Sequence, residues 1–143
     1  NPQGKLSAND FIFPYANNSF DLVILTSVFT HMLGTPMENY LMQISRVLEA
    51  GGRSFITYYL RTPLSAQGIF SGKSTFNFNC RRDGCWIQGE GTPEAAVCYD
   101  LTDLEALYAE AGLSIEKVVT TKWWDGSEPT GQDFIVARKA GHG

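Results

Sequence analysis

The sequence feature that most constrains the fold is an apolar run that ends abruptly in polar residues. Residues 20–25 are apolar except for one aspartate and lack the alternation of a half-exposed strand. Such a run predicts a parallel strand buried on both faces of an α/β sheet. Four polar side chains follow at once: Thr26, Ser27, Thr30 and His31. Because ligand crevices in open α/β sheets lie at the carboxyl ends of strands, we expect the chemistry at this polar elbow, residues 26–32.

A helix and a second strand come next, which predicts a right-handed βαβ unit. Thr35 is the expected N-cap, with Pro36 at the first helical position and Glu38 completing a capping box. The pair Gly51-Gly52 is expected to end the helix, because glycine accepts the left-handed conformation of a C-cap. Residues 53–60, rich in β-branched and aromatic side chains, predict the next strand.

The remainder of the chain alternates between irregular and regular patterns. Residues 61–99 predict an insertion of loops or a β-hairpin, with a strand-like alternation over 74–79 and a hairpin turn at Asp83-Gly84. A helix is expected over 101–111, capped by Asp100 or Thr102 and ended by Gly112. The other expected segments are strands 113–121 and 133–138, a turn at 1–4 and a tail at 140–143.

Composition limits the classes of function. The 143 residues predict one domain, and 43% hydrophobic residues allow a substantial core. A net charge of −4, with Lys and Arg not clustered, argues against a nucleic-acid partner. We expect no membrane segment, since no apolar run is long enough, and a cytoplasmic location, since the sequence shows no leader pattern.

The three cysteines, Cys80, Cys85 and Cys98, lack the spacing of a zinc site. We therefore expect no metal. The thiols are expected to be free in a reducing compartment, with a Cys80–Cys85 bridge as the alternative.

Several short motifs together resemble the carboxyl-terminal half of class I S-adenosylmethionine-dependent methyltransferases. Their order and spacing carry the resemblance, which is close over residues 10–60. The motifs are Phe13-Pro14-Tyr15, Ser19-Phe20-Asp21-Leu22-Val23, Ser27-Val28-Phe29-Thr30-His31-Met32, Tyr40-Leu41, Ile44, Arg46-Val47-Leu48 and Gly51-Gly52-Arg53.

The resemblance implies a partial Rossmann-like methyltransferase fold within a single domain, 1–143. We expect a mixed sheet of about four strands, two main helices and the insertion at 61–99. In the family, a glycine-rich loop upstream of these motifs cradles the amino-acid part of S-adenosylmethionine. This sequence contains no Gly-x-Gly-x-Gly, so we expect a truncated chain whose cofactor binding on its own is in doubt.

The resemblance also implies the site residues. His31 is the candidate catalytic residue, and the alternative is a structural histidine that caps or packs beneath the following helix. The candidate cofactor-binding residues are Asp10, Phe11, Ile12, Ser27, Val28, Thr30 and His31. From their places after the insertion and in the last turn, rather than from the resemblance, the candidate substrate-binding residues are Tyr99, Trp124 and Gln132. Glu94, Asp100, Trp123 and Asp133 are further positions expected near the substrate.

Two functions remain open at this point. The first is methyl transfer from S-adenosylmethionine to a small-molecule acceptor. The second is a non-catalytic half-domain that dimerises or acts as a scaffold through an open sheet edge. Without upstream strands, residues 20–27 would form that edge, and we expect a homodimer there or association with a missing half. A nicotinamide-dependent dehydrogenase is weaker, because nothing in the elbow favours it.

Overall fold

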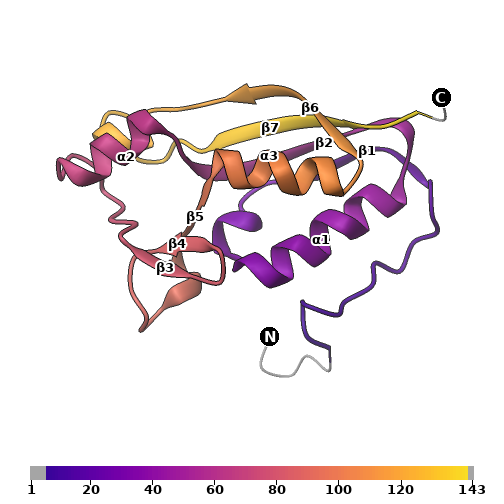
Figure 1. Cartoon of the computed structure of the whole chain (residues 1–143), viewed down its shortest axis with the longest axis horizontal. Helices are drawn as coiled ribbons and strands as arrows, with labels where there is room; N and C mark the ends of the chain where they lie inside the picture. The colour runs from indigo at the N-terminus through magenta and orange to yellow at the C-terminus, as the bar shows by residue number, and fades with distance from the viewer. Residues whose placement is uncertain (1–5, 142–143) are drawn as a thin grey trace.

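The computed structural model describes residues 6–141, and the turn expected at 1–4 and the last two residues of the expected tail lie outside them. Ten strands and α-helices follow in order along the chain (Figure 1). They are β1 Phe20–Leu25, α1 Gly34–Val47, β2 Leu48–Arg61, α2 Pro63–Phe70, β3 Cys80–Arg82, β4 Cys85–Ile87, β5 Val97–Asp100, α3 Leu101–Glu110, β6 Leu113–Val119 and β7 Asp133–Lys139. Three short 3-10 helices are η1 Phe29–His31, η2 Pro93–Ala95 and η3 Trp123–Asp125.

The sheet is mixed, which confirms the α/β class. It has seven strands in the order β3-β4-β5-β2-β7-β6, with β1 also paired to β2. The pairs β1–β2 and β2–β5 are parallel, whereas β2–β7 and β6–β7 are antiparallel. The four expected strands are present, and β5 and the β3–β4 hairpin add three to them.

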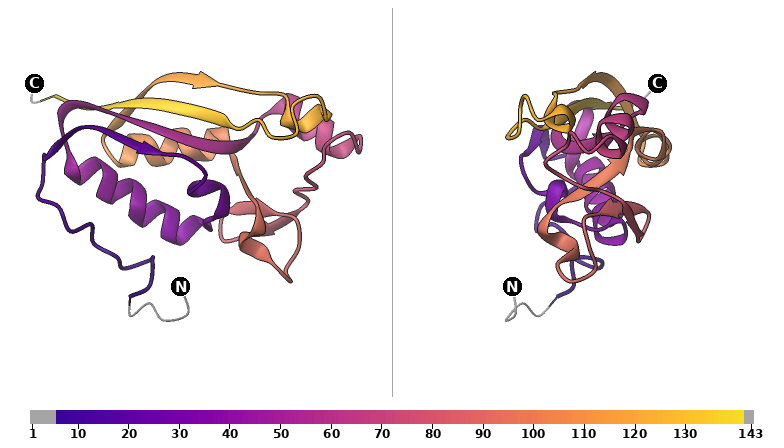
Figure 2. Two further views of the ribbon diagram at one scale, coloured as in Figure 1. Left: turned by 180° about the vertical axis from the view of Figure 1, so that it is seen from behind. Right: turned by 90° about the vertical axis from the view of Figure 1, so that its left-hand side faces the viewer.

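Helices α1 and α3 lie on the same side of the sheet (Figures 1 and 2). Leu41 and Ile44 of α1 and Leu104 of α3 are completely or almost completely buried there against Ile56 of β2. This face supplies most of the apolar core, and both helices expected from the sequence are present on it.

The expectation that β1 is buried on both faces is wrong. Leu22 and Ile24 are 50% and 59% exposed, while Val23 and Leu25 pack against the core. Within residues 6–141, β1 pairs only with β2. The strand therefore alternates between a covered and an uncovered face and forms an edge, as expected for residues 20–27.

The predicted cap of α1 is also wrong. The N-cap is Leu33, which has no side-chain capping bond. Thr35 instead donates its hydroxyl to Asp83 Oδ1 (2.6 Å), and its amide donates to Asp83 Oδ2 (2.7 Å). A Cβ atom at Gly34 would lie 2.0 Å from the Asp83 carbonyl oxygen, so the hairpin backbone touches the start of α1. The cap thus comes from a residue 48 positions away.

The helix ends earlier than Gly51-Gly52 suggested. Leu48 is the C-cap of α1, and β2 begins there. Gly51 does adopt a left-handed φ of +81°, but inside β2. The β1–β2 register passes from Phe20↔Leu48 to Leu22↔Arg53, so β2 contains several extra residues at this point. The left-handed conformation of Gly51 therefore allows the irregular pairing of β2 at this point and does not end a helix.

The insertion has more regular structure than expected. Residues 74–79 form a loop, not a strand, and α2 precedes them. The hairpin turn at Asp83-Gly84 is confirmed, with φ values of +49° and +76°. At the end of the insertion, β5 pairs in parallel with the last three residues of β2.

Candidate functional site

The elbow after β1 is held in a strained conformation by two neighbouring strands. Ser27 has a φ of +56°, which is uncommon for a residue with a side chain. Its amide donates to Thr57 Oγ1 of β2 (2.9 Å), and its hydroxyl accepts from the Gln132 side-chain amide (3.1 Å). The structure therefore brings together Ser27 and Gln132, which are 105 residues apart.

The 3-10 helix η1 anchors the elbow in the core. The ring of Phe29 is fully buried, with its centroid 5.8 Å from that of Tyr58. Val28 is partly buried against the same core. Thr30 is fully buried, and its hydroxyl has no hydrogen-bond partner within the described residues. Thr26 and Ser27 remain exposed, so the upper part of the elbow is open to a ligand.

His31 is exposed at the end of η1. Its Nδ1 lies 3.2 Å from the carbonyl oxygen of Glu94 in η2. A carbonyl can only accept, so this bond places a proton on Nδ1 and leaves Nε2 of the neutral ring as an acceptor. The contact orients the imidazole, and no group within residues 6–141 bonds to Nε2.

Tyr99 is a buried residue of β5 that contacts the end of the elbow at Met32. Its hydroxyl donates to the Met32 carbonyl, and its ring meets Tyr58 edge to face, with centroids 6.0 Å apart. Only 2% of Tyr99 is exposed, and burial raises the pKa of its hydroxyl, which keeps the donor protonated. This burial argues against the direct substrate contact expected for Tyr99 and gives it a positioning role.

Asp133 is the buried polar centre next to Gln132. Its carboxylate accepts from the amides of Leu60 (2.8 Å) and Thr121 (2.7 Å) and from Nε1 of Trp123 (2.8 Å). Burial raises the pKa of the carboxyl, and these hydrogen bonds act in the opposite direction. Asp133 therefore ties the end of β2 to the β6–β7 connection and holds Gln132 beside the elbow.

The two tryptophans pack rather than forming an open platform. Trp123 is fully buried, and Trp124 is partly buried against α2. A Cβ atom at Gly68 would lie 2.5 Å from the Trp124 carbonyl oxygen, so the glycine permits this close approach. Trp124 lies at the rim of a small apolar cluster around Trp123.

Residues 10–12 lie along α1. The carbonyl of Phe11 accepts from the Asn39 side chain (2.9 Å), and the ring of Phe11 lies 6.2 Å from that of Tyr40. Asp10 and Ile12 are exposed. Within residues 6–141, no hydrogen bond joins this segment to the elbow.

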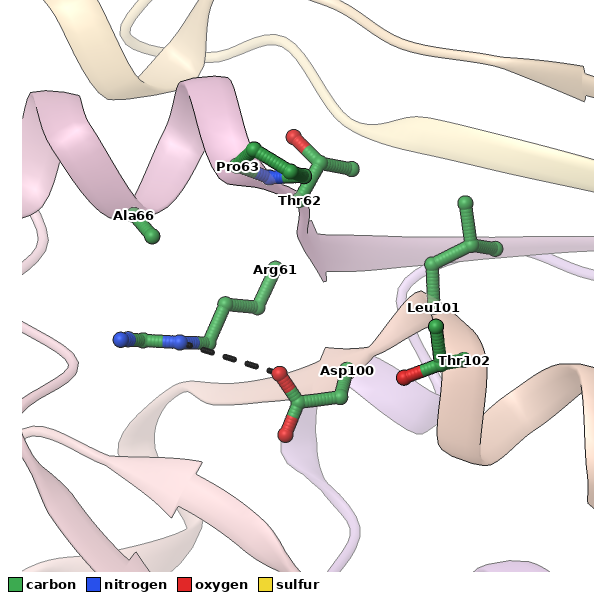
Figure 3. A pocket seen from close by; sticks show the side chains of 7 residues that line it. All are labelled: Arg61, Thr62, Pro63, Ala66, Asp100, Leu101 and Thr102. Carbon is green, nitrogen blue, oxygen red and sulfur yellow. Dashed lines mark ion pairs between the residues drawn. The ribbon is translucent and has the colours of Figure 1, made fainter.

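A cavity that the sequence did not predict lies at the carboxyl ends of β2 and β5, and we call it the Arg61 cavity (Figure 3). Its volume is about 330 Å³. Arg61 and Asp100, the last residues of the two strands, face one another across it, with Nε and Oδ1 3.7 Å apart. Only the recognition of β5 as a strand would have placed these two side chains together.

The cysteines of the described residues form no disulfide, so the alternative of a Cys80–Cys85 bridge is wrong. Cys80, Cys85 and Cys98 are free thiols. Burial raises the pKa of Cys85 to about 11 and also raises that of Cys98, while a hydrogen bond to Glu90 raises that of Cys80.

No group of three or more metal-binding side chains occurs within residues 6–141. Among the described helices, none has both the length and the apolar character for a membrane span.

Comparisons with known proteins give partial matches to methyltransferases. A family model described as a methyltransferase domain matches residues 3–56. The tRNA N(3)-cytidine methyltransferase METTL2 of Bos taurus is 28% identical over 113 residues, which cover 79% of this chain and 27% of that protein.

Solved structures share the fold at low sequence identity. A SAM-dependent methyltransferase of Methanosarcina mazei matches 96% of this chain and 66% of its own, with 14% identity and a TM-score of 0.60. The 1,6-didemethyltoxoflavin-N1-methyltransferase of Burkholderia thailandensis, solved with its substrate and S-adenosylhomocysteine, matches 94% of this chain and 49% of its own, with 13% identity and a TM-score of 0.60. The chain therefore spans about a quarter of its curated relative and half to two thirds of these structures.

Proposed function

We propose that this chain is part of a class I S-adenosylmethionine-dependent methyltransferase and that its elbow forms one wall of the methyl-transfer site. One observation carries the proposal. The carboxyl end of a parallel strand leads into a left-handed Ser27, fixed by Thr57 and Gln132, with polar side chains left exposed. This is the position at which open α/β sheets bind ligands.

The cofactor is S-adenosylmethionine, whose sulfonium supplies the reactive methyl group. Two features of the elbow suit a polar ligand. The exposed hydroxyls of Thr26 and Ser27 offer donors and acceptors, and the buried hydroxyl of Thr30 has no partner within the described residues. The sequence contains no Gly-x-Gly-x-Gly loop, so we assign this chain only one wall of the site.

His31 is our candidate for proton transfer. Its Nε2 is the free acceptor once Nδ1 donates to Glu94, so the ring can take a proton from a bound acceptor group. Methyl transfer depends mainly on proximity and orientation, and only some acceptors need a base. The contact with Glu94 gives His31 the orientation that this role requires.

We propose a small-molecule acceptor. The chain has 15 acidic against 11 basic residues, which does not favour attraction of a polyanion. METTL2 is named for activity on tRNA, and we do not extend that substrate to this chain. We also place the protein in the cytoplasm, where three free thiols remain reduced.

A specific observation favours association through β1. The strand has one paired edge within residues 6–141, and its exposed face carries Leu22 and Ile24. Unpaired apolar edges bind further strands. We propose that a second copy or a separate polypeptide covers β1 and, with it, the open side of the elbow. The same contact underlies the scaffolding alternative.

Sedimentation tests the association. At concentrations well above micromolar we expect a dimer or larger species, and Leu22→Lys with Ile24→Lys should make it monomeric. Met42→Lys is the matched control, because Met42 is 51% exposed on α1, away from the strand edge. A monomeric wild-type protein would argue against this interface.

Calorimetric titration with S-adenosylmethionine tests the enzymatic proposal. We expect saturable heat at millimolar ligand and about tenfold weaker binding by Gln132→Leu, because the hydrogen bond that positions Ser27 is lost. Gln67→Leu, on the exposed side of α2, should bind like wild type. No heat from the wild-type protein would leave only the scaffolding function for this chain.

A further inference from the structure

The guanidinium of Arg61 is a partly buried cation whose hydrogen-bonding capacity is mostly unused. Its side chain is 25% exposed and stacks over Trp86, with 4.0 Å from Cζ to the ring centroid. Its one ionic partner, Asp100, is 3.7 Å away, beyond hydrogen-bond distance. Within residues 6–141, no acceptor takes a hydrogen bond from the Arg61 guanidinium.

Asp100 is already satisfied by other donors. Its Oδ2 accepts from Arg81 Nη1 (2.9 Å) and from Trp86 Nε1 (3.0 Å). Two guanidinium groups therefore share one carboxylate, which leaves a net charge of +1 among Arg61, Arg81 and Asp100. Arginine offers two parallel N–H groups that match a carboxylate or a phosphate.

Arg61 also separates two hollows. The Arg61 cavity lies on one side of it, between the first turns of α2 and α3 (Figure 3). A second cavity of about 290 Å³ lies on the other side and includes Phe70, Phe78, Trp86 and Asn79 in its lining. Phe70 is 94% exposed, an unusual position for a large apolar side chain next to a cation.

We propose that Arg61 binds the carboxylate or phosphate of a small molecule whose ring or apolar part occupies the cavity beside Phe70 and Trp86. The oxyanion would accept hydrogen bonds from the two terminal nitrogens of Arg61. The apolar part of the molecule would cover the exposed face of Phe70. Stacking on Trp86 holds the guanidinium in place without consuming its donors.

This binding site is distinct from the elbow. Thr57, which holds Ser27, and Arg61 lie four residues apart on β2, about 13 Å along the strand. The nearly buried Tyr59 lies between them and packs against the fully buried Trp123. The inference therefore goes beyond the proposed methyl transfer, and its test needs no S-adenosylmethionine.

Binding of four probes to the whole chain tests the proposal: phenyl phosphate, benzoate, inorganic phosphate and neutral benzyl alcohol. Calorimetry gives the affinity, and the nitrogen-15 NMR signal of the Trp86 indole N–H, which donates to Asp100, reports the location. We expect both aromatic anions to bind more tightly than benzyl alcohol and inorganic phosphate. The tighter of the two anions identifies the natural oxyanion.

Three variants should change the affinity for the aromatic anions in different ways. Arg61→Gln should weaken binding of the aromatic anions about tenfold or more, because a charge-assisted bidentate contact is lost. Asp100→Asn should strengthen it about threefold, because the competing carboxylate charge is removed. Arg53→Gln, on the same strand but paired to Glu116 and 50% exposed, should bind like wild type.

Two results would overturn the proposal: equal affinity for benzyl alcohol and the anions, or an Arg61→Gln variant that binds them as wild type does. Because Asp100 keeps Arg81 and Trp86 as partners when Arg61 is replaced, this variant should still fold. A failure here would leave the cofactor titration at the elbow unaffected, so the two proposals fail separately.

Discussion

Replacing Asp133 by asparagine should destabilise the protein far more than its conservative chemistry suggests. The carboxylate is 1% exposed, and each of its oxygens serves N–H donors. Oδ1 accepts from Thr121, and Oδ2 accepts from Leu60 and Trp123. An asparagine has one acceptor oxygen, so in either orientation its NH2 group faces at least one buried N–H donor.

The magnitude follows from these contacts. In the better orientation the oxygen serves Leu60 and Trp123, and the Thr121 amide loses its acceptor. Hydrogen bonds to a charged group contribute about 1.5–3 kcal/mol each, and an unsatisfied buried donor costs about 1–3 kcal/mol. We expect Asp133→Asn to lower the free energy of unfolding by about 1–3 kcal/mol, the penalty of leaving the Thr121 amide without an acceptor.

Urea unfolding followed by tryptophan fluorescence measures this loss, since Trp123 itself is a partner of Asp133. Asp125→Asn, on the same connection but only partly buried and bonded to Ser127 alone, is the matched control and should shift the midpoint much less. Equal midpoints for the two variants would refute the reasoning. The buried variant should also weaken the contact between Gln132 and Ser27, because Asp133 fixes the chain next to Gln132.

Three further perturbations follow from the packing and the buried thiols. Gly68→Ala should destabilise the protein by about 1–3 kcal/mol in urea unfolding, because its Cβ would lie 2.5 Å from the Trp124 carbonyl oxygen; an unchanged midpoint would contradict this contact. Gly34→Ala should cost at least as much, since its Cβ would meet the backbone of Asp83 at 2.0 Å, and NMR shifts of the hairpin should follow. Alkaline pH should lower stability: the pKa of Cys85 is raised from 9.0 to about 11, so from about pH 9 to 11 the unfolded chain has lost a proton that the native state retains. The urea midpoint should therefore fall between pH 9 and 11, and a midpoint that stays level or rises would show that Cys85 titrates normally.

The parts of the fold that depend on local pattern could be predicted from the sequence. The helix after the elbow, the Asp83-Gly84 turn and the strand 20–25 are each predicted from residues close together in the sequence, and the structure has all three. Gly51 is left-handed, but not at the helix end where the sequence placed it. Its place in β2 was not predictable, because the irregular β1–β2 register is a tertiary property.

The missed features all depend on distant partners. The cap on α1 comes from Asp83, so no pattern near Thr35 could reveal it. The four-residue β5 is too short for a periodic signal, and it is defined by pairing with Tyr59, Leu60 and Arg61. For the same reason, the cavity between Arg61 and Asp100 could not be predicted from the sequence. At the elbow, the resemblance implied Ser27 and the last turn suggested Gln132, whereas their mutual contact required the structure.

The length of β2 has a mechanical consequence. A single strand of 14 residues carries both Thr57, behind the elbow, and Arg61, at the second cavity. Its first part is paired to β1 and β7 as far as Tyr58, and its last three residues are paired to β5, so no neighbouring strand spans the junction between Tyr58 and Tyr59. The two ligand positions therefore share one strand but are held by different neighbours, and this junction is the point at which they could shift relative to one another.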